Sequence, residues 1–151
     1  MHNMQYELYS DEYFMNEALK EAHTAFARQE IPVGAVIVTD NRIIARAFNM
    51  SETLNDATAH AELLAITSAS NTLGTKFLTR ATLYVTVEPC TMCAGACYWA
   101  RLHRIVYGAP DRKAGFTRIS ALIIHPAAKV VSGILEKECK KLMKDFFSLK
   151  R

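Results

Sequence analysis

Hydrophobic positions near the start of the chain recur at helical spacing. Residues 12–29 carry apolar side chains every three or four positions, which predicts an amphipathic helix. One face of this helix holds Phe14, Ala18, Ala22 and Phe26. Ser10 and Asp11 are suited to cap its start, and Pro32 is expected to end it.

The rest of the chain alternates between extended and helical patterns. Continuous or alternating apolar runs predict strands over residues 33–39, 42–49, 83–87, 104–107 and 129–131. The first two strands are joined at Asp40-Asn41, a pair suited to a tight hairpin turn. Helical spacing predicts further helices over residues 59–70, 91–101 and 134–149, the last with Leu135, Leu142, Phe146 and Leu149 on one face.

This order of elements predicts an α/β fold. Strands separated by helices favour parallel pairing with right-handed crossovers, whereas the first hairpin must be antiparallel. We therefore expect a mixed five-stranded sheet with helices on both faces, a three-layer α/β/α sandwich, in a single domain over residues 1–151. The pattern does not define the order of the strands in the sheet.

Size and composition fit this expectation. The chain has 151 residues, half of them hydrophobic, which suits one packed core. It contains no apolar run near the roughly 20 residues that a membrane span needs, so we expect no membrane association. Residues 1–11 lack the basic start and apolar stretch of a secretory signal, so we expect a cytoplasmic protein.

The formal net charge of +3 is mild, but the basic residues are unevenly distributed. They follow the cysteine motif and fill the last segment, at Arg101, Arg104, Arg112, Lys113, Arg118, Lys137, Lys140, Lys141, Lys144, Lys150 and Arg151. A basic stripe is typical of a surface that binds a polyanion. The alternative is an ordinary solvated helix face that Glu136, Glu138 and Asp145 balance, and charge alone favours this alternative.

Four cysteines are too few for a disulfide-stapled secreted domain of this length and favour a metal site in a reducing compartment. Cys90 and Cys93 form a C-x-x-C motif. Cys139 lies in the pattern of the last helix and is expected in the core. Cys97 lies four residues beyond Cys93, so it is either a small buried thiol, which we expect, or a fourth ligand that would close the site.

The candidate chemistry lies in two short motifs, His60-Ala61-Glu62 and Pro89-Cys90-Thr91-Met92-Cys93. Imidazole and thiolate are zinc ligands, and three protein ligands leave a fourth position for water, as in catalytic zinc sites. His60, Cys90 and Cys93 are the three candidate ligands, and Glu62 is a spare carboxylate suited to carry protons. Both motifs open helices, where the helix dipole favours thiolates, and strand 83–87 leads to the carboxyl edge of the sheet, where ligands bind.

The pattern H-x-E…P-C-x-x-C is the signature of zinc-dependent deaminases that act on nucleobases. Over nearly its whole length the chain resembles the bacterial tRNA adenosine deaminases, which form inosine at the wobble position of the anticodon. The matching stretches are residues 31–36, Asn49, 56–62, 83–90, 92–96 and 145–147 with the basic tail. The resemblance implies a cytidine-deaminase-like fold.

The resemblance also implies roles for particular residues. His60, Cys90 and Cys93 would hold one Zn²⁺ per subunit with water as the fourth ligand, and Glu62 would be the catalytic proton shuttle. Asn49 would bind the flipped nucleoside, Val33 would help to wall the base pocket, and the backbone amides of Ala61 and Cys90 would lie near the scissile bond. The family is homodimeric, and its C-terminal helix contacts the anticodon loop of the tRNA. Phe147 is the better candidate for such a contact, because helical spacing places Phe146 in the core.

Other functions remain open at this point. Tyr98-Trp99-Ala100-Arg101 is similar to guanine deaminases of the same fold, and segment 114–126 departs from the pattern of the tRNA enzymes. A deaminase of free bases or nucleosides, of the guanine or cytosine type, is therefore the alternative. A zinc-stabilised RNA-binding module without catalysis would have no need for Glu62. Trp99 is expected in the core or in a dimer interface.

Overall fold

A computed structural model describes residues 5–150 and contains a five-stranded sheet with the strand order β2-β1-β3-β4-β5. The strands are β1 (Gly34–Thr39), β2 (Arg42–Phe48), β3 (Thr82–Val87), β4 (Arg104–Ala109) and β5 (Lys129–Val131). The helices are α1 (Asp11–Ala27), α2 (Ala61–Leu73), α3 (Thr91–Ala100) and α4 (Glu136–Leu149). Two short 3-10 helices, η1 (Phe116–Arg118) and η2 (Ala121–Ile123), lie in the segment between β4 and β5.

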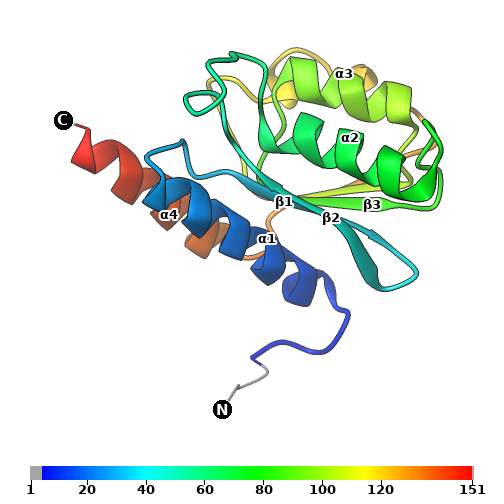
Figure 1. The fold of residues 1–151 in the computed structure, drawn as a ribbon, viewed down its shortest axis with the longest axis horizontal. Coiled ribbons are helices and arrows are strands. Elements are labelled where there is room, and N and C mark those ends of the chain that lie inside the picture. The colour runs from blue at the N-terminus through cyan, green and yellow to red at the C-terminus, as the bar shows by residue number, and fades with distance from the viewer. Residues whose placement is uncertain (1–4, 151) are drawn as a thin grey trace.

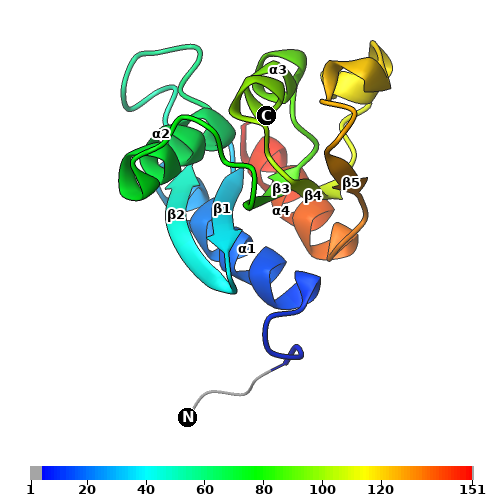
Figure 2. The same cartoon turned by 90° about the vertical axis from the view of Figure 1, so that its right-hand side faces the viewer.

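The helices cover both faces of the sheet. Figures 1 and 2 show α2 and α3 on one face, with α1 and α4 on the other. Each face has its own core cluster, one including Ile37, Leu83 and Ile105, the other including Phe14 and Val36. The predicted three-layer α/β/α sandwich with a mixed sheet is confirmed.

Strand directions also follow the prediction. β1 pairs antiparallel with both β2 and β3, whereas β3, β4 and β5 run parallel. The hairpin turn has φ of 50° at Asp40 and 59° at Asn41, the left-handed pair that a two-residue hairpin requires. Because β3 and β4 are parallel, the loops that follow them leave the same edge of the sheet, and the site lies at this edge.

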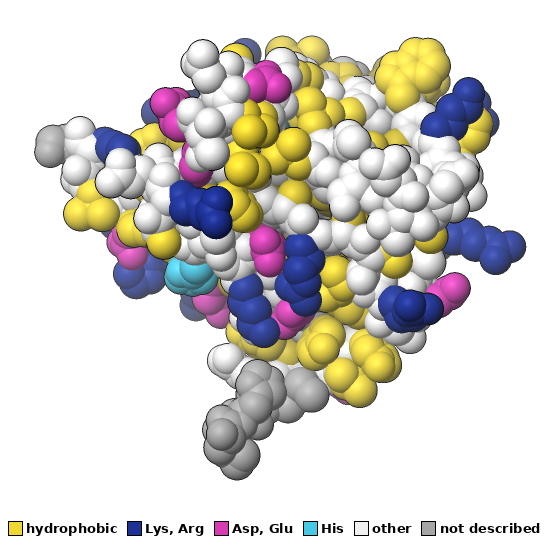
Figure 3. All heavy atoms as spheres, in the orientation of Figure 1, with side chains coloured by type: hydrophobic (Ala, Val, Ile, Leu, Met, Phe, Trp, Pro, Cys, Tyr) yellow, Lys and Arg dark blue, Asp and Glu magenta, His cyan; other side chains and the backbone are white. Residues whose placement is uncertain are grey.

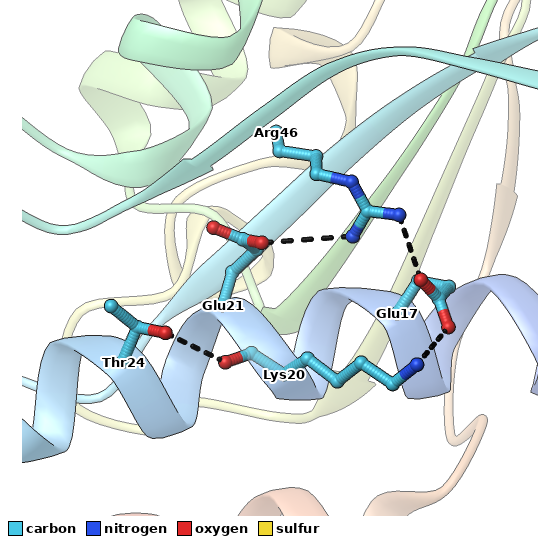
Figure 4. A network of polar contacts seen from close by, with 5 residues as sticks. All are labelled: Glu17, Lys20, Glu21, Thr24 and Arg46. Carbon is cyan, nitrogen blue, oxygen red and sulfur yellow. Dashed lines mark hydrogen bonds and ion pairs between the residues drawn. The ribbon is translucent and has the colours of Figure 1, made fainter.

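Close backbone packing joins α1 to the sheet. Gly34 opens β1 where α1 crosses it, and a Cβ there would overlap the carbonyl oxygen of Ala18. At the solvent side, Arg46 of β2 reaches down to α1 and pairs with Glu17 at 2.7 Å and Glu21 at 3.6 Å (Figure 4). Lys20 pairs with the second oxygen of Glu17, so this surface network links the edge strand to the helix.

Helix boundaries differ from the prediction by up to three residues, the largest difference being the end of α2 at Leu73 instead of residue 70. α1 starts under a Ser10 cap, as expected, and ends at Ala27 because Gln29 has a left-handed φ of 63°. α2 begins at Ala61 rather than at residue 59, which leaves His60 as an extended N-cap residue. α4 begins at Glu136 because Leu135 has a φ of 53°, and β4 runs two residues further than predicted.

Burial corrects one expectation about the core. Phe146 and Cys139 are buried, as predicted, and Phe147 is 43% exposed. Trp99, however, is 75% exposed and does not contribute to the core of the chain. The reason is that α3 packs inward through small residues, Cys93, Ala94, Cys97 and Ala100, which leaves Trp99 on its outer side. Within residues 5–150, no helix is long and apolar enough to cross a membrane.

Candidate zinc site and its cavity

Two helix starts bring the candidate ligands together. His60 is the N-cap residue of α2, Cys90 is the N-cap residue of α3, and Cys93 lies in the first turn of α3. One ligand atom from each lies within 4.8 Å of the other two. His60 Nδ1 is 3.6 Å from Cys90 Sγ and 3.5 Å from Cys93 Sγ. Tetrahedral zinc, with bonds of about 2.0 Å to nitrogen and 2.3 Å to sulfur, requires N···S separations of about 3.6 Å, so the donors fit zinc.

The electrostatics of the two thiols also fit a divalent cation. A hydrogen bond from Cys93 lowers the pKa of the Cys90 thiol to about 4, and the same bond with burial raises the pKa of Cys93. The Cys90 thiol also raises the pKa of His60 through their hydrogen bond. Two thiolates so close together need a cation between them, and a thiol that coordinates zinc is deprotonated.

Glu62 lies in the first turn of α2 beside these ligands and is 4% exposed. Burial raises the pKa of its carboxyl group to about 7. A carboxyl group with this pKa gains and loses a proton near neutral pH, which is the property that a general acid–base group needs. Cys97, by contrast, is 1% exposed and lies outside the ligand group, so the expectation of a buried thiol is confirmed.

A cavity of about 640 Å³ opens over His60 and Cys90. The residues proposed from the sequence to touch substrate all line it: Val33, Asn49, Ala61, Glu62 and Phe147. The structure thus brings together, from four separate segments, every substrate-contacting and catalytic residue that the sequence suggested. Their individual roles remain predictions.

Comparison with known proteins identifies the family. Residues 8–109 match the family model described as the cytidine and deoxycytidylate deaminase zinc-binding region. The chain belongs to this zinc-dependent deaminase family. A tRNA-specific adenosine deaminase from Agrobacterium fabrum is 46% identical over 92% of this chain and 95% of its own length.

Solved structures give the same picture. A structure from a study of A-to-I editing by tRNA:A34 deaminases is 46% identical, with a TM-score of 0.81, over 86% of this chain and 98% of that chain. A guanine deaminase from Bacillus subtilis is 44% identical, with a TM-score of 0.64, over 67% of this chain and 65% of its own. The deaminase is thus similar to members with different substrates.

Two buried glutamates of the deaminase escaped the sequence analysis. Glu30 accepts hydrogen bonds from the loop after β2, and Glu88 accepts them from the loop after β4. In each case a threonine, Thr53 or Thr117, donates both its backbone N–H and its hydroxyl to the carboxylate. Glu88 directly follows an apolar strand and precedes Pro89, and this interruption of the apolar run was the signal that could have revealed it.

Glu88 shapes the segment that departs from the tRNA enzymes. Its carboxylate lies so close to Gly115 that a Cβ there would overlap it. The bonds from Asp111 and Thr117 hold the start of this segment against the strand that carries the cysteines. Ala114 lines the cavity, whereas Ile119 and Leu122 further along are 61% and 87% exposed.

Three basic side chains of the deaminase line the cavity. Arg112, Lys113 and Lys140 line it, the first two from the loop after β4 and the third from α4. On the face shown in Figure 3, Lys and Arg side chains are scattered, with acidic side chains between several of them. Arg151 of the expected basic tail lies outside the described residues.

Proposed function

We propose that this deaminase converts adenosine to inosine at the wobble position of tRNA anticodons. The observation that carries the proposal is the 46% identity to a tRNA-specific adenosine deaminase along nearly the whole of both chains. The open cavity, with Arg112, Lys113 and Lys140 around it, suits a base that projects from a polyanionic strand.

The proposed ligands are His60, Cys90 and Cys93, which hold one zinc ion per subunit with water as the fourth ligand. When bound, zinc supplies a water molecule whose pKa is lowered toward neutrality. Val33 and Phe147 wall the cavity that receives the base, and Asn49 hydrogen-bonds the nucleoside. The backbone amide of Ala61 lies at the N-terminus of α2, where partial positive charge favours a developing negative charge.

Glu62 moves the protons in this scheme. Its carboxylate takes a proton from the attacking water and delivers it to N1 of adenine, while the water oxygen bonds to C6. Glu62 then passes the second proton to the amino group, the C6–N6 bond breaks, and ammonia leaves. One water is consumed and one ammonia released for each inosine formed, and Glu62 returns to its starting state.

A second copy of the chain is the proposed partner of α3. The outer side of this helix exposes Met92, Tyr98 and Trp99, and the neighbouring 3-10 segment exposes Ile119 and Leu122. Exposed apolar and aromatic side chains of this kind are typical of a homodimer interface. In analytical ultracentrifugation, we expect the wild type to sediment as a dimer and Trp99→Glu to sediment as a monomer.

We further propose that the enzyme works in the cytoplasm, where its free cysteines stay reduced.

The experiment for the substrate compares zinc-loaded enzyme on an anticodon stem-loop, with adenosine at the wobble position, and on free guanine, cytosine and cytidine. Inosine formation in the stem-loop, with a rate that falls steeply as salt is added, is the expected result. The identity to a guanine deaminase makes free guanine the alternative substrate. Ammonia release from guanine, with no change in the stem-loop, would contradict the proposal.

A further inference from the structure

Glu30 is a buried carboxylate whose position the zinc chemistry does not explain. It lies just after α1 and is 0% exposed. Oε2 accepts bonds of 2.6 Å from both the backbone N–H and the hydroxyl of Thr53. Oε1 accepts a bond of 3.1 Å from the N–H of Glu52 and a bond of 3.4 Å from the side-chain amide of Asn49. The two oxygens therefore face four donors and no acceptor.

These donors determine the charge of Glu30. Burial alone would raise the pKa of its carboxyl group, but the hydrogen bonds from Thr53 and from the backbone of residues 52 and 53 outweigh burial and lower it. An ionised carboxylate can only accept hydrogen bonds. The atom of the Asn49 side chain that faces Glu30 must therefore be the amide nitrogen.

The orientation of the Asn49 amide follows from this contact. Its nitrogen has two N–H groups, one directed to Glu30 and the other to Ser51 Oγ at 3.3 Å. No donor among residues 5–150 reaches Asn49 Oδ1, and no fully buried side-chain nitrogen or oxygen among these residues lacks a partner. Oδ1 is therefore not fully buried, and Asn49 lines the catalytic cavity. The cavity thus presents a hydrogen-bond acceptor at this position.

An acceptor requires a donor on the substrate. The ring nitrogens of adenine are acceptors, and its one donor, the amino group, is at the reacting carbon. Within an RNA strand the 3′ and 5′ oxygens of the sugar are esterified, so the 2′-hydroxyl is the remaining donor. We infer that Glu30 is a positioning residue that fixes Asn49 as the acceptor for the 2′-hydroxyl of the target nucleotide. This inference rests on the proposed function and makes the site selective for ribose over deoxyribose.

The test uses two anticodon stem-loops that differ in one atom, with adenosine or 2′-deoxyadenosine at the wobble position. Loss of one well-placed hydrogen bond lowers kcat/KM of the wild type on the deoxy substrate by about tenfold. A third stem-loop, with the deoxy sugar at the next loop nucleotide, controls for changes in loop conformation and is expected to react like the all-ribose RNA.

Glu30→Gln tests the positioning role. The glutamine keeps its single oxygen on Thr53, where the two bonds are shortest, and turns its amide toward Asn49. Asn49 then presents nitrogen rather than oxygen to the cavity, and the tenfold preference for ribose disappears. Thr53→Val is the matched control, because it weakens the bond to the loop but leaves the acceptor for Asn49 in place. This variant is expected to lower Tm and to retain the preference.

Two further measurements keep the inference open to contradiction. If Glu30→Gln fails to fold, Asn49→Ala is expected to lose the same preference. Dissociation constants of the two stem-loops for a Glu62→Gln variant report the sugar contact without turnover, and the same tenfold difference is expected. Equal activity of the wild type on both stem-loops, or an undiminished preference in Glu30→Gln, would overturn the inference. No turnover of either stem-loop would contradict the proposed function itself.

Discussion

Glu62 and Glu30 are almost equally buried, at 4% and 0% exposure, yet their pKa values move in opposite directions. Burial raises the pKa of Glu62 to about 7. Glu30 is also penalised by burial, but donors from Glu52 and Thr53 more than compensate, and its pKa is lowered. The hydrogen-bond donors around Glu30 favour its ionised form, so it is suited to be a fixed acceptor, whereas Glu62 is suited to exchange protons.

Glu88 extends the comparison to the other wall of the cavity. Like Glu30, it accepts both the backbone N–H and the hydroxyl of one threonine. The two carboxylates hold the loops that follow β2 and β4, and Glu62 lines the cavity beside the zinc ligands. One buried glutamate is therefore placed for chemistry, and two are placed to build the cavity around it.

The largest expected effect is the loss of activity when Glu62, the proposed proton carrier, is replaced. Glu62→Gln removes the proton carrier but preserves the shape of the side chain, so kcat falls by roughly 10³-fold, in the range for loss of a general acid–base group. Zinc content by atomic absorption and Tm stay close to wild type, because neither the ligands nor a hydrogen-bonded anchor is removed. Retention of more than a tenth of the wild-type kcat would remove Glu62 from the mechanism.

The free energy of unfolding is expected to respond in the opposite way: Glu30→Gln should lose more stability than Glu62→Gln. Glu30→Gln replaces an acceptor with an amide among four donors, and an unsatisfied buried donor costs about 1–3 kcal/mol. We expect a loss of about 2 kcal/mol in the free energy of unfolding, or roughly 4–8 °C in Tm for a domain of this size. Urea unfolding of zinc-loaded protein measures it, with Glu62→Gln as the matched control. A larger loss in the control would break the comparison.

The pH dependence of the free energy of unfolding tests whether Glu30 is ionised in the folded protein. The folded-state pKa of Glu30 lies below the ordinary glutamate value of 4.5, so its ionised form stabilises the fold. That contribution is fully present above pH 4.5 and is lost as the pH falls through the folded-state pKa. The stability difference between wild type and Glu30→Gln should therefore shrink below pH 4.5. A difference that grows on acidification would contradict the assignment, and protonation of the zinc ligands affects both proteins alike.

The smallest expected effect is that of replacing Cys97. This thiol is buried near the zinc ligands, and we assign it no part in proton transfer or in holding the cavity loops. Cys97→Ala removes one small side chain from the packed side of α3, at a cost of about 1 kcal/mol. Zinc stoichiometry and kcat are expected to match wild type. Loss of stoichiometric zinc from this variant would show that the site has four protein ligands.

The sequence was sufficient for the layers of the fold and for the zinc ligands, because both depend on local patterns. The spacing of apolar residues predicted the helices and strands, and two short motifs contained the candidate ligands His60, Cys90 and Cys93. The order of the strands and the exposure of Trp99 depend on which faces pack together, which spacing along one helix does not define. Glu30 and Glu88 were missed because their partners come from loops 22 to 29 residues away along the chain.

The most direct test of the central claim is mass spectrometry of the anticodon stem-loop after incubation with zinc-loaded enzyme in ¹⁸O-labelled water. Hydrolytic deamination transfers the water oxygen to C6, so the account predicts inosine at the wobble position that carries the label. The Glu62→Gln variant should leave adenosine in place over the same time. An unchanged wobble adenosine with wild-type enzyme, or inosine without the label, would contradict the account.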